Sequence, residues 1–245
     1  MNSSWKDRLY EAYVSSGQAR GGTQLTAPRT NPYITAIIRK HLPTNRGTEI
    51  VDLGCGHGTF VHLLKQAGYT RVRGVDVSAE QVDLAHQWGI TEVEQSDILT
   101  FLAEQPPDST DVILCMDVLE HLERQETFDI LDHIYRVLRP GGQLLAHVPN
   151  AEGLFGMRVR YGDFTHEVSF TPRSIASVLT TVGFQRIWCL EDKPIPHSVM
   201  SMIRRVIWEI GTLPFRVLLA AETGRRSFIL SQNMLVGARR PDSDR

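Results

Sequence analysis

The sequence predicts an α/β protein in which a mostly parallel sheet is covered by helices on both faces. Three observations lead to this prediction. Between residues 49 and 148, short apolar runs alternate five times with stretches of helical periodicity. Most of the helical stretches begin at a capping residue or end at a glycine. The chain has 245 residues, of which 42% are hydrophobic, and this is enough for one large domain with its own core.

The alternating region is expected to contain five strands and three helices. Each strand is a short run of mainly apolar residues, and the helices repeat their apolar residues at helical spacing. The expected strands are 49–54, 71–77, 91–98, 111–118 and 142–149. The expected helices are 59–68, 78–89 and 124–142, with Pro140-Gly141 ending the last one. Sheets of this kind bind ligands at the carboxyl ends of their strands, so the chemistry is expected just after residues 53, 76, 97, 116 and 148.

The rest of the chain continues the alternation less regularly. A loop is expected over 149–170, followed by a helix that starts at the Thr171-Pro172 cap and ends at Gly183. A helical pattern also covers 198–222, interrupted by Gly211 and Pro214. The last two expected strands are 184–191 and 227–239.

Composition excludes several classes of protein. The net charge is −2, so no general attraction to nucleic acid is expected. The N-terminal residues lack the apolar core of a signal peptide, and no apolar run is long enough to span a bilayer. The three cysteines, Cys55, Cys115 and Cys189, fit neither a disulfide framework nor a zinc site. These features are typical of a reduced, cytoplasmic protein.

The turn after the first expected strand is rich in glycine. The segment VDLGCGHG places Gly54, Gly56 and Gly58 where the backbone can approach a ligand closely. The dinucleotide fingerprint is G-x-G-x-x-G, whereas the spacing here is G-x-G-x-G, so a nicotinamide-dependent oxidoreductase is disfavoured. A tight structural turn is the simpler alternative.

From this turn onward the chain resembles the class I S-adenosylmethionine-dependent methyltransferases. VDLGCGHGTF resembles their first motif, GVDVS the second and SDI the third, and DVILCMDVLEHL and LRPGG match later landmarks in order. The resemblance covers about residues 48–191. It implies a Rossmann-like, mostly parallel seven-stranded sheet, and S-adenosyl-L-methionine as cofactor.

The resemblance also implies which residues bind the cofactor. Asp52 and the glycine turn would hold the methionine part, Asp76 the ribose hydroxyls, Val77 the adenine face, and Asp97 and the Ile98 backbone the adenine edge. Loop capping is the alternative role for both Asp76 and Asp97. The implied binding residues are Asp52, Gly54, Cys55, Gly56, Asp76, Val77, Asp97, Ile98, Met116 and Asp117.

Catalytic residues are expected in the polar segment YGDFTHEVSF, residues 161–170. His166 is the predicted general base, since a histidine titrates near neutral pH, and Asp163 is predicted to orient it. Satisfying the loop's own backbone is the alternative role for both. His121 suits a capping role or the active site equally well. No metal is expected, because no acids and histidines show convincing ligand spacing, and activity should survive a chelator.

The chain is expected to divide into three parts. Residues 1–48 would form an N-terminal helical lid or arm, 49–191 the cofactor-binding core, and 192–245 a helical segment and the strand that completes the sheet. The two ends are basic, with net charges of +5 for 1–48 and +3 for 191–245, against −10 for 49–190. The apolar segment 198–221 could pack on the sheet, form a homodimer, or lie peripherally on a membrane.

The acceptor is expected to be a small molecule or a glycan. FTHEVSFTPRSI resembles a stretch in methyltransferases of bacterial glycan and cell-surface polysaccharide clusters, and more weakly one in ubiquinone-biosynthesis O-methyltransferases. The first hypothesis is therefore O-methylation of a sugar hydroxyl in a glycan or glycolipid precursor. O- or N-methylation of a phenolic or other small metabolite is the alternative.

Overall fold

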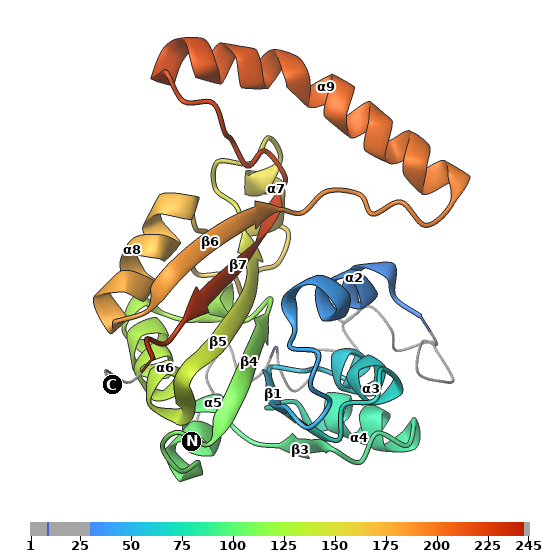
Figure 1. The fold of residues 1–245 in the computed structure, drawn as a ribbon, viewed down its shortest axis with the longest axis vertical. Helices are drawn as coiled ribbons and strands as arrows, with labels where there is room; N and C mark the ends of the chain where they lie inside the picture. Colours follow the sequence, from blue (N-terminus) through green and yellow to red (C-terminus); the bar gives the residue numbers. More distant parts are fainter. Residues whose placement is uncertain (1–8, 10–29, 243–245) are drawn as a thin grey trace.

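A computed structural model of the protein describes Leu9 and residues 30–242. Seven strands form one sheet in the order β3-β2-β1-β4-β5-β7-β6 (Figure 1). β7 is antiparallel to both its neighbours, and the remaining pairs are parallel. The strands are β1 (Glu49–Leu53), β2 (Arg71–Asp76), β3 (Val93–Gln95), β4 (Thr110–Met116), β5 (Leu138–Pro149), β6 (Gln185–Glu191) and β7 (Asn233–Arg239). The predicted fold class is confirmed.

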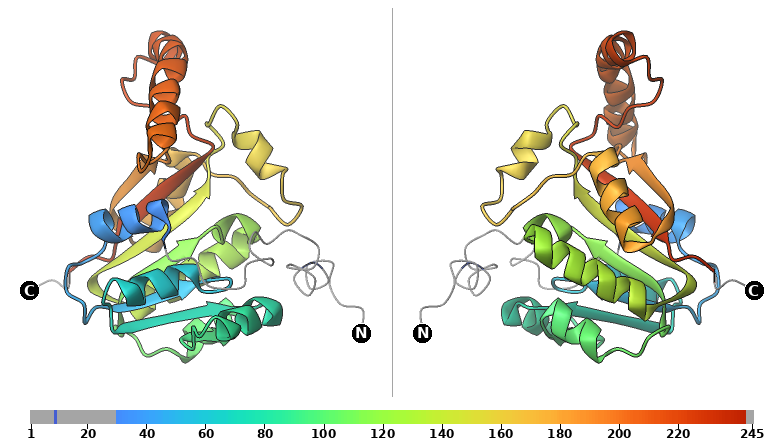
Figure 2. Two further views of the ribbon diagram at one scale, coloured as in Figure 1. Left: turned by 90° about the vertical axis from the view of Figure 1, so that its right-hand side faces the viewer. Right: turned by 90° about the vertical axis from the view of Figure 1, so that its left-hand side faces the viewer.

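Helices cover both faces of this sheet, as the two side views show (Figure 2). One face packs against α2 (Pro32–His41), α3 (Thr59–Gln66) and α4 (Ala79–Gln87). The other face packs against α5 (Ile98–Glu104), α6 (Arg124–Val137) and α8 (Pro172–Val182). Alternate residues of the central strands supply the two cores, so Ile50 faces one helical layer and Val51 the other.

Several element bounds differ from the prediction for local reasons. The third strand is only three residues long, because Asp97 caps α5, a helix that the sequence analysis did not predict. The helix α6 ends at Val137, and β5 begins at once with Leu138 in an extended conformation. Pro140 accounts for this early end, since a proline disfavours helical geometry at the preceding residue. The expected loop 149–170 contains a short helix, α7 (Gly156–Arg160).

The expected interruption at Gly211 and Pro214 does not break the helix α9 (Val199–Thr223). A proline removes one backbone hydrogen bond, and that loss need not end a helix whose two halves are held elsewhere. Ion pairs hold both halves here. Before the proline, Glu209 pairs with Lys193 at 3.0 Å between Oε1 and Nζ, and after it, Arg216 pairs with Glu191 at 2.7 Å.

The helix α9 lies apart from the sheet, at the top of Figure 1. Its polar side contributes the ion pairs and the buried Ser201 and Thr212. Its apolar side chains are exposed to solvent, so they do not pack on the sheet. The most exposed of them are Val199, Met200, Ile207, Ile210 and Leu218. In the described part of the chain, no helix combines the length and apolar character needed to cross a membrane.

Candidate active site

The glycine turn between β1 and α3 forms the floor of the site. Gly54 and Gly56 have φ values of 67° and 55°, in the left-handed region that favours glycine. A Cβ atom on Gly54 would lie 2.4 Å from the Val118 side chain, so this position also requires the absence of a side chain. The backbone N–H groups of Gly54 and Cys55 both donate to the Val75 carbonyl, which fixes the turn against β2.

Two carboxyl groups flank this turn, Asp52 buried and Asp76 half-buried. The Asp76 carboxylate accepts hydrogen bonds from the backbone N–H groups of Gly56 at 2.8 Å and Ser78 at 2.9 Å. Asp76 therefore has the loop-capping role that was the alternative to ribose binding. A carboxylate has about four acceptor positions, so about two remain for a ligand. Burial raises the pKa of Asp76, and burial together with Asp76 raises the pKa of Asp52 to about 8.

All ten predicted cofactor residues line one pocket of about 580 Å³ at the carboxyl ends of β1, β2 and β4. They are Asp52, Gly54, Cys55, Gly56, Asp76, Val77, Asp97, Ile98, Met116 and Asp117. An elongated ligand with a cationic end and vicinal hydroxyls fits this set, because acids lie along the pocket and Val77 offers an exposed apolar side chain. The contact of each residue with S-adenosyl-L-methionine stays a prediction.

Two members of the set also have structural roles. Asp97 accepts from the Thr100 backbone N–H at 3.0 Å and caps α5. Cys55 packs its sulfur over Gly74, where a Cβ would lie 2.7 Å from Sγ. Burial raises the pKa of the Cys55 thiol well above its usual value, so this cysteine is inert rather than nucleophilic.

Only part of the predicted N-terminal lid can be located in the structure. The lid assigned to residues 1–48 lies mostly outside the described residues, which include 30–48 of that range. The helix α2 within them packs on α3, and Ile34 contributes to the pocket wall. Asn31 caps this helix by accepting from the backbone N–H groups of Tyr33 and Ile34.

A buried histidine that the sequence analysis did not identify lies at the end of β5. His147 Nδ1 is 2.6 Å from Asp117 Oδ1, and Nε2 is 3.4 Å from Asp192 Oδ2. Burial alone would lower the pKa of His147, but the two carboxylates raise it to about 10. The Tyr33 ring packs edge-on against the imidazole. Asp117, on the pocket wall, is therefore held by an ion pair from the neighbouring strand.

The polar segment that follows β5 does not have the predicted arrangement. Asp163 Oδ1 accepts from both the backbone N–H and the hydroxyl of Thr165, at 2.8 and 2.6 Å. The Asp163 carboxylate thus forms a turn with Thr165 and does not orient His166. The buried Thr165 hydroxyl also lies 2.7 Å from Nδ1 of His121. Because that hydroxyl donates its proton to Asp163, His121 Nδ1 is the donor to Thr165, and Asp163 orients His121 instead.

His166 is held by the backbone of its own segment. Its Nδ1 lies 2.9 Å from the Val159 carbonyl, so the ring donates from Nδ1. The ring packs edge-on against His121, with 4.7 Å between centroids. His121 lines the cofactor pocket, and His166 lies behind it. Burial and the neighbouring His166 lower the pKa of His121 to about 4, so His121 is neutral.

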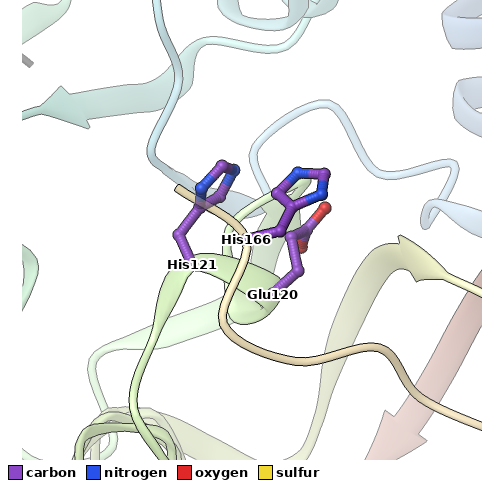
Figure 3. Close-up of side chains that lie close together, drawn as sticks. All are labelled: Glu120, His121 and His166. Atoms are coloured by element: carbon purple, nitrogen blue, oxygen red, sulfur yellow. The ribbon is translucent and has the colours of Figure 1, made fainter. Parts of the chain in front are cut away.

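Glu120 completes a cluster that the sequence analysis missed. The carboxylate of Glu120 and the rings of His121 and His166 lie together, with one candidate ligand atom from each within 4.8 Å of the others (Figure 3). Glu120 is 1% exposed, and burial raises the pKa of its carboxyl group well above the usual range. The motif Glu-His was visible in the sequence, but no local signal shows that His166, 45 residues after His121, lies beside it.

The comparisons with known proteins agree with this geometry. A family model described as a methyltransferase domain matches residues 29–189, which is more than half of the chain. The chain therefore belongs to the methyltransferase domain family, and it is an enzyme that uses S-adenosyl-L-methionine as methyl donor. This result sets aside the nicotinamide alternative.

Individual relatives add detail. The chain is 31% identical over 146 residues to a ubiquinone biosynthesis O-methyltransferase from Xylella fastidiosa, covering 58% of this chain and 57% of that relative. The chain thus spans little more than half of this relative's length. A methyltransferase structure from Archaeoglobus fulgidus has a TM-score of 0.62 at 23% identity, covering 86% and 95% of the two chains. A Haemonchus contortus phosphoethanolamine N-methyltransferase 2 structure has a TM-score of 0.63 at 18% identity, covering 98% and 61%.

Proposed function

We propose that this enzyme transfers the methyl group to a hydroxyl oxygen of a small acceptor. The observation that carries the proposal is the pair of imidazoles beyond the methyl-donor pocket. Each ring donates its Nδ1–H to a protein oxygen, so in the neutral ring Nε2 has the lone pair. A hydroxyl must lose a proton when it is methylated, and an imidazole nitrogen accepts protons near neutral pH. The O-methyltransferase named above supports the same chemistry.

The cofactor supplies an electrophilic methyl group bound to a sulfonium sulfur, and the protein supplies alignment and a dry site. Asp76 and the glycine turn would hold the cofactor by its ribose and methionine parts. The oxygen of the acceptor would lie near Met116, Asp117 and His121, at the ends of β4 and η1 (Leu119–His121). His166 as general base stays a prediction. His121 lines the pocket wall as a neutral ring, because its lowered pKa of about 4 makes it a weak base.

Two classes of hydroxyl are candidates for the methyl acceptor. A sugar hydroxyl of a glycan or glycolipid precursor is the acceptor expected from the segment around His166. A phenolic hydroxyl is the second candidate, and the ubiquinone biosynthesis O-methyltransferase relatives favour it.

We also propose that the exposed apolar side of α9 contacts a membrane surface. Arg204 on α9 is exposed, and so are Arg225 and Arg226, which follow the end of the helix. A second copy on this surface would bring like charges together, whereas anionic lipid headgroups would attract them. Such contact would suit a lipid-linked acceptor.

A direct experiment tests the reaction type. Purified protein is incubated with radiolabelled cofactor and a panel of nucleotide sugars, lipid-linked sugars, phenols and amines. Label transferred to a hydroxyl of either candidate class is the expected result. Transfer to the amines alone would contradict O-methylation.

A further inference from the structure

We propose that Glu120, His121 and His166 bind one divalent transition-metal ion at the acceptor side of the pocket. Two imidazoles and one carboxylate form the donor set of many catalytic zinc and iron sites, in which a further coordination position is left for water or substrate. Binding of the ion is independent of the proposed function. Its part in the reaction rests on that function.

The first argument is the unsatisfied carboxylate. Glu120 Oε2 is buried and has no hydrogen-bond partner in the part of the chain that the structure describes. A buried polar atom without a partner costs about 1–3 kcal/mol, and more when it is charged. A cation beside it would remove this cost.

The second argument is the state of the two rings. His121 donates its Nδ1–H to Thr165, and His166 donates its Nδ1–H to the Val159 carbonyl. Metal-binding histidines commonly donate the other ring nitrogen to an oxygen in this way, which fixes the tautomer and the direction of the lone pair. His121 is also linked to a carboxylate through Thr165, because the Thr165 hydroxyl donates to Asp163.

The third argument is that the two segments carrying the donors are held together before any ion binds. The Glu120 carbonyl accepts the backbone N–H groups of Glu167 at 2.7 Å and Val168 at 3.2 Å. Arg160 donates to the carbonyl oxygens of His166 and Glu167. The bonds to the Glu120 carbonyl join two segments that are far apart in the sequence, and the Arg160 bonds hold the second segment's own backbone.

The distances are compatible with an ion. The three candidate ligand atoms lie within 4.8 Å of one another. Ligands about 2.0–2.2 Å from a zinc ion are about 3.5 Å apart in a tetrahedron. The set would therefore have to contract by about 1 Å for all three atoms to bind one ion.

The position of the cluster suggests what the ion would do. His121 lines the pocket that holds the predicted cofactor residues, so an acceptor hydroxyl there could replace a water ligand. Coordination lowers the pKa of a bound hydroxyl. Its O–H bond would then break with the proton passing to solvent water, and the oxygen would remain bound to the metal as the nucleophile. With the ion bound, the histidines act as its ligands, and the base role given to His166 in the proposed function belongs to the metal-free protein.

The test uses the whole protein after removal of metal with a chelator. Binding of Zn²⁺ is measured by calorimetry, and Co²⁺ is added as a second probe because its visible absorption reports nitrogen and oxygen ligands. We expect one Zn²⁺ ion per chain. Glu120→Gln and His166→Gln should each abolish this stoichiometric site. Thr165→Val should weaken binding by about 10–100-fold, the usual effect of losing a contact to a ligand.

Controls separate loss of the site from loss of the fold. His62→Gln on α3 removes a histidine outside the cluster, whose Nε2 lies 2.8 Å from Gln66 Nε2, and it should leave Zn²⁺ binding unchanged. Every variant must keep its melting temperature within a few degrees and bind S-adenosylhomocysteine. A variant that fails is replaced by Glu120→Ala or His166→Asn. Absence of binding to the folded wild-type protein, or stoichiometric binding that survives both ligand substitutions, would overturn the proposal.

The two proposals fail differently. If metal-free protein binds no Zn²⁺ and still methylates a hydroxyl at the full rate, the metal site is wrong and O-methylation stands. If one ion binds through these residues and only amines are methylated, the metal site stands and the proposed function is wrong.

Discussion

The cofactor side and the acceptor side of the pocket are built in different ways. On the cofactor side, the predicted binding residues lie at the ends of neighbouring strands, and their main contacts are a few residues away or on the next strand. Asp76, for example, binds Ser78 and the glycine turn. On the acceptor side, His121 depends on Thr165, and Asp117 depends on His147. The first side is local and the second is assembled from distant segments, so each should respond differently to mutation.

The largest effect is expected on the acceptor side. His166→Gln should slow turnover by roughly 10²–10⁴-fold, the usual contribution of a group that assists proton transfer. Affinity for S-adenosylhomocysteine should be nearly unchanged, because the predicted cofactor residues lie elsewhere in the pocket. Turnover, cofactor affinity and melting temperature are measured on one preparation. A folded variant with near wild-type turnover would show that the segment 161–170 is only structural.

The next effect is expected on the cofactor side. Asp76→Ala would remove the acceptor of both ribose hydroxyls, and each charge-assisted hydrogen bond contributes about 1.5–3 kcal/mol. The Kd for S-adenosylhomocysteine should therefore rise at least about tenfold, as measured by calorimetry. Asp83→Ala, on the exposed side of α4, is the matched control and should bind normally. Equal affinity in the Asp76 variant and its control would rule out the ribose assignment.

The cofactor side could be predicted from the sequence, whereas most contacts of the acceptor side could not. Strand ends, glycine turns and motif order are visible in the sequence, and the ten predicted cofactor residues line one pocket. The short α5 was missed because Asp97 was read as the end of a strand rather than as a helix cap. Side-chain partners across long separations leave no periodic signal. This explains why Asp163 was assigned to its neighbour His166, whereas it binds Thr165 and through it His121.

His147 offers a pH test of the acceptor side. Its pKa is about 10 in the folded protein, above the ordinary value of 6.5. The ion pair with Asp117 therefore contributes its full stability below about pH 6.5, and this contribution is lost as the pH rises through about 10. The melting temperature of the wild-type protein should fall more between pH 7 and 10.5 than that of His147→Gln. One kcal/mol corresponds to about 2–4 °C in a chain of this size. Parallel melting curves for the two proteins would contradict the assignment.

The smallest effect on the purified enzyme is expected in α9, which contacts neither side of the pocket through its apolar face. Ile207 and Ile210 are 64% and 67% exposed there, so replacing both with glutamate should leave the melting temperature and cofactor affinity unchanged. Turnover on a water-soluble acceptor should also be unchanged.

Co-sedimentation with vesicles containing anionic phosphatidylglycerol should be lost, because burial of each apolar side chain contributes about 1.5–3 kcal/mol and two negative charges repel the lipid. Replacing Glu222, which is exposed on the same helix, with glutamine is the control and should keep vesicle binding. Light scattering on the same samples tests whether a second copy of the chain covers this surface instead. If the wild-type protein is a dimer that the double substitution dissociates, and neither form binds vesicles, then the exposed side of α9 is an interface between two copies rather than a membrane contact.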